Sequence, residues 1–245
     1  MTEAIINWFA DFKADFYLNF IKGNRWKLLL EGLGSTLQIT ALAVLLGIVI
    51  GIVIATIRSS HDKNSTKLHG FGGFIVKLLN GLAKLYLTVI RGTPVVVQLM
   101  IMYFIIFATS NNKLLIAVLA FGINSGAYVA EIFRSGIMSI DEGQMEAGRS
   151  LGLNYFETMI YIIVPQAFKT VLPTLANEFI VLLKETSVAG YVGMMDLTRA
   201  GDMIRGVTFS AFMPLIAVAV IYLVMVVILT KLVSLLERRL RNSER

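Results

Sequence analysis

The sequence predicts an all-α membrane protein with five membrane-spanning helices, interfacial helices and one polar helical loop on the cytoplasmic side. Apolar residues make up 56% of the 245-residue chain, and its mean hydropathy is +0.75. Several runs without a charged residue are long enough to cross a bilayer. Helix-capping residues gather between two of those runs, at residues 139–164. We therefore expect residues 1–245 to form a single transmembrane domain.

Residues 1–31 are charged, but their large apolar residues recur at helical spacing. This pattern predicts an amphipathic helix that lies in the membrane interface. Trp8, Tyr17 and Trp26 suit the headgroup zone. The apolar positions are Ile5, Ile6, Phe9, Phe12, Phe16 and Phe20.

The first predicted span covers residues 32–57, which carry no charge. Its Gly47, Gly51 and Ala55 lie four residues apart, a spacing that favours close helix packing. Residues 71–91 have helical periodicity with one polar face, and we interpret them as an amphipathic elbow on the cytoplasmic surface. A membrane-crossing register that starts inside this stretch stays open.

Thr93 and Pro94 predict a helix start, with Thr93 as N-cap, and the uncharged residues 94–112 form the predicted second span. Three further spans follow. They cover residues 114–134, 165–183 and 206–230. A glycine-containing loop lies between the last two.

Five spans place the termini on opposite sides of the membrane. With the C-terminus inside, 14 of the 22 Lys and Arg residues fall in cytoplasmic segments. The positive-inside rule therefore predicts an outside N-terminus and a cytoplasmic C-terminus. The net charge of +6 fits this distribution, and no basic cluster with interleaved aromatics indicates nucleic-acid binding.

Two capped helices are predicted in the loop at 139–164. Ser139 and Glu142 match a capping box, Gly152 is a helix stop, and Asn154 repeats the N-cap pattern with Glu157. Pro165 is expected to break or kink the second helix.

Polar residues inside the predicted spans are the candidate functional groups, because burying them in lipid is costly. Glu178 is the deepest carboxylate, and interhelical hydrogen bonding is an equal alternative for the polar groups around residues 124–131. Glu131 and Arg134 are spaced for a local ion pair. The candidates for a substrate path are Gln98, Asn124, Ser125, Tyr128, Asn177 and Glu178.

Catalytic and metal sites are not expected. The sequence has no Gly-Lys pair, and therefore no phosphate-binding P-loop, and it has no cysteine. His61 and His69 lie in a polar loop without companions that suit a metal, so we expect both to be solvated.

Several sequence strings resemble one family of membrane proteins. E-A-G-x-x-x-G at 146–152, followed by I-V-P-Q-A at 163–167, resembles the EAA loop of binding-protein-dependent ABC importer permeases. RGTPVVVQL at 91–99, NSGAYVAEIFRSGI at 124–137 and NEFIVLLKETSV at 177–188 are similar to polar amino acid permeases of the histidine, glutamine and arginine type. The resemblance implies a multi-pass protein of the bacterial cytoplasmic membrane that imports a polar amino acid by alternating access.

This resemblance also implies the partners. They are a cytoplasmic ABC ATPase dimer that binds ATP and Mg, a second permease subunit (identical or homologous), an extracytoplasmic substrate-binding protein, the amino acid and membrane lipid. The chain itself is expected to bind no cofactor and to catalyse no reaction. The residues implied to couple to the ATPase are Glu146, Ala147, Gly148, Arg149 and Gly152.

Two alternatives belong to other classes. A stand-alone ion-coupled carrier or channel would need its own coupling-ion site, for which Glu178 and Glu131 are the candidates. A structural membrane scaffold would leave the carboxylate of Glu178 without a role.

Overall fold

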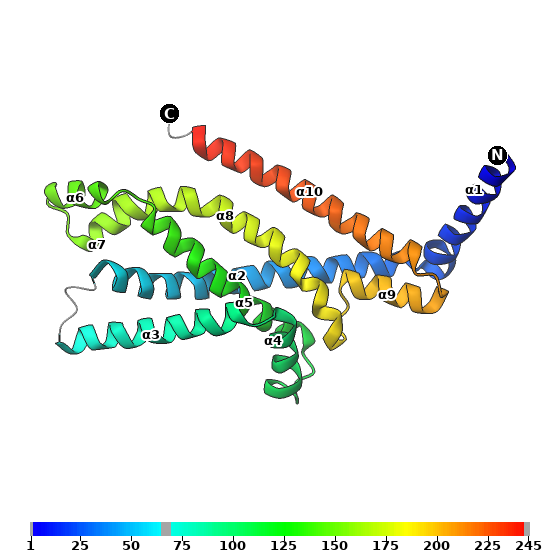
Figure 1. Ribbon diagram of the computed structural model, residues 1–245, viewed down its shortest axis with the longest axis horizontal. Helices are drawn as coiled ribbons and strands as arrows, with labels where there is room; N and C mark the ends of the chain where they lie inside the picture. The colour runs from blue at the N-terminus through cyan, green and yellow to red at the C-terminus, as the bar shows by residue number, and fades with distance from the viewer. Residues whose placement is uncertain (1, 65–69, 243–245) are drawn as a thin grey trace.

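A computed structural model of the protein describes residues 2–64 and 70–242, and all regular structure within these ranges is helical (Figure 1). His69 and residues 243–245 lie outside the described residues, and the side chains of Ile5, Ile6 and Trp8 are likewise not described. The helices are α1 (Thr2–Phe16), α2 (Trp26–Asn64), α3 (Gly70–Gly92), α4 (Val95–Ile101), α5 (Lys113–Met138), α6 (Glu142–Ser150), α7 (Tyr155–Thr158), α8 (Val164–Glu185), α9 (Leu197–Thr208) and α10 (Phe212–Asn242).

The long helices run lengthwise along an elongated molecule, and the short helices lie mainly at its two ends (Figure 1). Helices α6 and α7 lie at one end, which we call the loop end. Helices α1 and α9 lie toward the other end, and the N-terminus is there too. The last turns of α10 point toward the loop end, so the two termini are far apart.

Five helical stretches within the described residues are long and apolar enough to cross a membrane, which confirms the predicted fold class. The first, third and fourth contain the predicted spans 32–57, 114–134 and 165–183. The five stretches are Trp26–Asp62, Gly70–Gly92, Lys113–Met138, Tyr155–Val192 and Phe212–Leu240.

The second predicted span, 94–112, is wrong. Its apolar helix reaches only from Val95 to Ile106, which is short for a span, whereas α3 has the length and hydropathy of one. Helix α3 has 23 residues, a length of about 34 Å. Its cations share one face, so its sequence has the pattern of a surface helix. Thr93 does not cap α4 either, because its hydroxyl donates to the Val89 carbonyl at 2.8 Å.

The fifth span begins later than the predicted 206–230. The residues just before it form α9, which ends at Phe209 in the left-handed region with φ 55°. Asp196 starts α9 by accepting hydrogen bonds from the Thr198 and Arg199 amides at 2.9 and 3.2 Å. This carboxyl is fully buried, and burial raises its pKa above the ordinary value.

Pro165 does not break the fourth span. A π-helical turn at Met159–Ile163 precedes it, and Pro165 then lies in the first turn of α8, where its missing N–H is tolerated. The helical path therefore continues from α7 through α8, so of the predicted break or kink at Pro165 the break is wrong.

Small residues bring α2 and α5 into close contact, as the small-residue spacing predicted. A Cβ atom on Gly51 would overlap Val129, and one on Gly122 would lie 2.6 Å from Leu46 Cδ2. Gly47 and Gly126 make similar approaches, Gly47 to Ser125 and Gly126 to Ile50. Both helices contribute glycines to this seam, so the two backbones approach closely.

We expect Gly51→Ala to destabilise the protein by about 1–3 kcal/mol, because the added methyl group overpacks the seam against Val129. Gly34→Ala is the matched control. Gly34 is on the same helix with no atom within 4 Å of the added Cβ, so this change should add about 0.5–1 kcal/mol through helix propensity. Thermal unfolding in detergent measures both, and equal stability of the two variants would contradict the packing role.

Candidate functional site

The predicted start of α6 is shifted. Ser139 ends α5 and donates to the Gly136 carbonyl at 2.8 Å, while Asp141 caps α6 by accepting from the Gly143 amide at 2.7 Å. The predicted capping box of Ser139 and Glu142 is therefore wrong. Helix α5 runs on through Met138, so the chain leaves it too late for Ser139 to begin the next helix.

The end of α6 and the start of α7 match the prediction. Gly152 has φ +89° and donates to the Arg149 carbonyl at 3.0 Å, as expected for a helix stop. Asn154 and Glu157 then form a reciprocal capping box with hydrogen bonds of 2.9 and 2.8 Å. These bonds hold the two short helices as a compact corner at the loop end.

Gly148 lies inside this corner. A Cβ there would lie 2.5 Å from Thr158 Cγ2 and 3.0 Å from Ile162 Cδ1. Gly148 is therefore buried where α6 packs on the following helix, and its position offers no surface to a partner. Its neighbours Ala147 and Arg149 are exposed.

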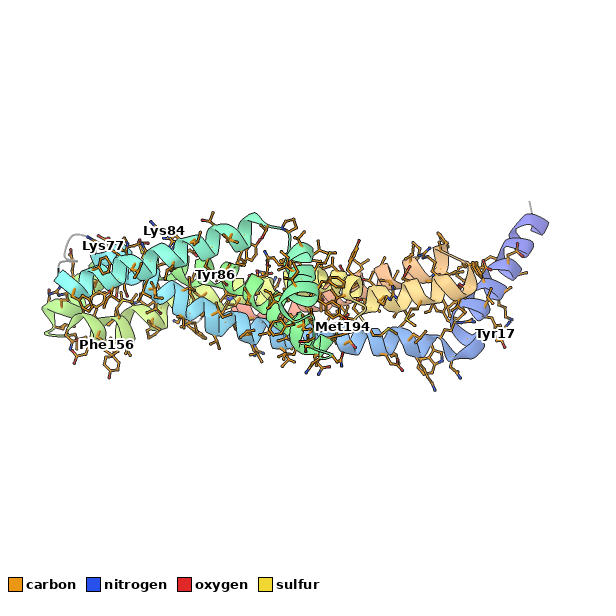
Figure 2. All side chains as sticks on the ribbon, turned by 90° about the horizontal axis from the view of Figure 1, so that it is seen from below. Tyr17, Lys77, Lys84, Tyr86, Phe156 and Met194 are labelled. Atoms are coloured by element: carbon orange, nitrogen blue, oxygen red, sulfur yellow. The ribbon has the colours of Figure 1, made fainter. Side chains whose placement is uncertain are left out.

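Large apolar side chains are also exposed at the loop end. Leu151 is 80% and Phe156 70% exposed. Figure 2 shows Phe156 extending away from the helices. Together with the exposed Glu146, Ala147 and Arg149, they give this end a mixed apolar and charged surface that suits a protein partner.

Glu178 and Ser125 form one buried polar pair between α8 and α5. The Ser125 hydroxyl donates to Glu178 Oε1 at 2.9 Å, and Glu178 is only 9% exposed. Gly47 of α2 faces the same serine, where an added Cβ would lie 3.1 Å from its Oγ. The pair therefore lies where three helices meet.

A second polar group joins α3, α4 and α5. Asn124 donates to Gln98 Oε1 at 3.0 Å. Gln98 in turn donates to the Ile90 carbonyl and the Thr93 hydroxyl, each at 2.8 Å. Gln98 and Asn124 thus fix the turn between α3 and α4, which is the interhelical hydrogen bonding considered for Asn124.

The other two candidates point elsewhere. Tyr128 lies beneath the Arg91 guanidinium, with 5.4 Å between the carbon of that group and the ring centre. Asn177 is exposed, whereas its neighbour Glu178 is buried. The six predicted residues therefore form separate groups rather than one pocket.

Sequence reasoning missed a charged groove between α2, α3 and α5. The groove has a volume of about 460 Å³ and is lined by Arg58, Lys84, Leu87, Thr88, Arg91, Gly92 and Glu131. Glu131 pairs with Arg58 at 3.3 Å and with Arg134 at 3.3 Å, which confirms the predicted local ion pair. The seven-residue spacing of Lys77, Lys84 and Arg91 was the available signal.

His61 lies 3.4 Å from a carboxylate oxygen of Asp62. Within the part of the chain that the structure describes, no group of three or more His, Cys, Asp or Glu residues is placed to hold a metal ion.

Five apolar helical stretches, polar groups buried between them and a capped helical corner at one end define a multi-pass membrane protein. The chain belongs to the family of binding-protein-dependent transport system inner membrane components, whose model matches residues 71–242. The predicted resemblance to this family is confirmed.

Relatives match over nearly their whole length. The glutamine transport system permease protein GlnP of Escherichia coli (strain K12) is 39% identical over 218 residues, covering 87% of this chain and 93% of the relative. The arginine transport system permease protein ArtQ of Bacillus subtilis (strain 168) is 37% identical over 219 residues, covering 88% and 94%.

Solved structures agree with this fold. A crystal structure of an amino acid ABC transporter with histidines superposes with a TM-score of 0.78 at 42% identity, covering 90% of this chain and 98% of the other. An inward-facing structure of the MetNI methionine ABC transporter has a TM-score of 0.73 at 18% identity, covering 88% and 97%, and supports the fold alone.

We expect Gln98→Ala to destabilise the protein by about 1–3 kcal/mol, because it leaves the buried Asn124 amide without its acceptor. In a double-mutant cycle with Asn124→Ala, the two costs should be coupled by about 0.5–3 kcal/mol. Unfolding in detergent measures the cycle. If the two losses of unfolding free energy are additive and the stably folded variants lose uptake, Gln98 and Asn124 contact the substrate instead of each other.

Proposed function

We propose that the chain is the transmembrane subunit of an ABC importer that carries a polar amino acid across the bacterial cytoplasmic membrane. The main support is its match to arginine and glutamine permeases over nearly their full length. In this proposal ATP and Mg bind to separate cytoplasmic ATPase subunits. A second permease chain and an extracytoplasmic binding protein complete the complex.

The proposed orientation places the loop end and the C-terminus in the cytoplasm and the N-terminus outside. With α3 counted as a span, segments 58–69, 134–169 and 231–245 hold 11 Lys and Arg residues, against eight in the segments placed outside, and this excess supports the orientation. The direction of α10 toward the loop end agrees with an odd number of crossings. Under this orientation the exposed corner of α6 and α7 faces the ATPase.

The corner is proposed to pass ATPase movement to the membrane helices. Glu146, Ala147 and Arg149 would make the contact, because they are exposed on α6. Gly148 and Gly152 would act indirectly, Gly148 by letting α6 pack on Thr158 and Gly152 by ending α6. Since the helical path continues from α7 into α8, a push on the corner would be passed to the fourth span.

Ala147→Arg tests this contact. Ala147 is exposed, so the variant should fold and insert normally. A long charged side chain in a fitted contact should cost about 1–3 kcal/mol or more, and therefore weaken ATPase association roughly tenfold or more. Co-purification of the ATPase measures the loss.

Ala211→Arg is the control, since it makes the same change at an exposed position beside α9. It should keep the ATPase. Wild-type association and uptake in Ala147→Arg would contradict the coupling role of α6.

Glu178 is proposed as the main recognition group of the substrate path. Its carboxylate lies within the fourth span with one hydrogen-bond donor, Ser125, and no cation within ion-pair distance in the described residues. An ammonium or guanidinium group of the substrate would supply the missing positive charge. Tyr128 and Asn177 are proposed to border the path, while Gln98 and Asn124 shape it.

We expect Glu178→Gln to reduce uptake of a cationic amino acid by about tenfold or more, since a charge-assisted hydrogen bond is worth about 1.5–3 kcal/mol. Ser125→Ala is the control, because it removes the same protein–protein hydrogen bond but keeps the charge. Uptake by complexes in proteoliposomes measures both. Unchanged uptake kinetics in Glu178→Gln would show that Glu178 does not recognise the substrate. Equal losses of uptake in both variants would show that the Glu178–Ser125 pair has a structural role.

A further inference from the structure

Helix α3 carries three cations at seven-residue spacing. Lys77, Lys84 and Arg91 are all exposed in the single chain, although α3 has the length and hydropathy of a membrane span. Figure 2 shows Lys77 and Lys84 on the same side of α3. Lysine and arginine side chains facing lipid are costly, so this side of α3 is expected to face water or protein.

Two of these cations line the charged groove, and the third does not. Lys84 and Arg91 lie along one wall, about 10 Å apart along the helix axis, with Arg58 of α2 also in the lining. Lys77 is outside the lining. The groove therefore holds three cations and a single carboxylate, that of Glu131.

That carboxylate is already occupied. Glu131 pairs with Arg58 and with Arg134, and Arg134 also pairs with Asp62 at 3.4 Å. Among the described residues no carboxylate lies within ion-pair distance of Lys84 or Arg91. The groove thus keeps an excess of positive charge.

We propose that this groove binds the carboxylate of the amino acid during its passage, with Lys84 as the principal contact and Arg91 and Arg58 beside it. This inference rests on the proposed import function. Lysine and arginine bind carboxylates through charge-assisted hydrogen bonds, and about 460 Å³ is enough for a small zwitterion. Glu178 is not in the lining, so the groove and the Glu178–Ser125 pair are separate sites. The groove would bind the negative group of the amino acid, and Glu178 would bind a positive group.

The geometry favours Lys84 over its neighbours. Arg91 stacks on Tyr128, and Arg58 is held by Glu131. Within the described residues, Lys84 neither stacks on an aromatic ring nor pairs with a carboxylate. Of the three cations in the lining, it therefore loses the fewest contacts when it turns toward a ligand.

The test measures binding of labelled L-arginine and L-glutamine to the purified permease–ATPase complex without binding protein. The reference is whichever amino acid the wild type binds. Lys84→Gln should weaken binding of that amino acid by about tenfold or more, and a tenfold loss of affinity corresponds to about 1.4 kcal/mol. Lys77→Gln makes the same change on the same helix outside the groove and should bind as the wild type does. Lys84→Arg should keep most of the affinity and shows that the position tolerates substitution.

Agmatine and 4-aminobutanamide, which are the two amino acids without their carboxylates, separate the proposed contact from a general effect. Lys84→Gln should not change their binding. Three results would each overturn the proposal. The first is equal amino acid binding by the wild type and Lys84→Gln, and the second is a loss of binding in Lys77→Gln equal to that in Lys84→Gln. The third is no binding of either amino acid by the wild type. ATP-dependent uptake in the same complexes tests the import function separately, because the wild type can transport even where the groove makes no contact.

Discussion

The close approach of α2 and α5 is the contact on which the rest of the structure depends. Glycines on both helices remove the side chains that would hold the two backbones apart. This approach places Ser125 beside both Gly47 and Glu178, and it brings Arg58 to Glu131. The buried pair and one wall of the charged groove therefore follow from the same seam.

The loop end is joined to this seam by helical continuity. Helix α6 is fixed to the chain after Asn154 because Gly148 leaves room for Thr158. The capping box at Asn154 then starts a helical path that includes a π-turn and carries Pro165 and Glu178. A single helical path therefore joins the corner at the loop end to the buried carboxylate of Glu178.

Sequence patterns predicted the number of spans, the glycine seam, the Asn154 capping box and the Glu131 ion pair, because each depends on local spacing. They failed where a tertiary arrangement decides the outcome. Helix α3 has the length and hydropathy of a membrane span although its cations share one face, and a groove shared with α2 and α5 receives two of them, Lys84 and Arg91. Gly148 is buried by a neighbour ten residues further along the chain, which composition cannot reveal.

The central claim is that this chain imports a polar amino acid only as part of an ATP-driven complex. The most direct test is uptake of labelled glutamine and arginine into proteoliposomes, with ATP on the face that carries α6 and loaded binding protein on the other. Our account predicts uptake that requires ATP, the ATPase subunits and the binding protein together. Uptake by the permease chain alone, driven by an ion gradient, would contradict it.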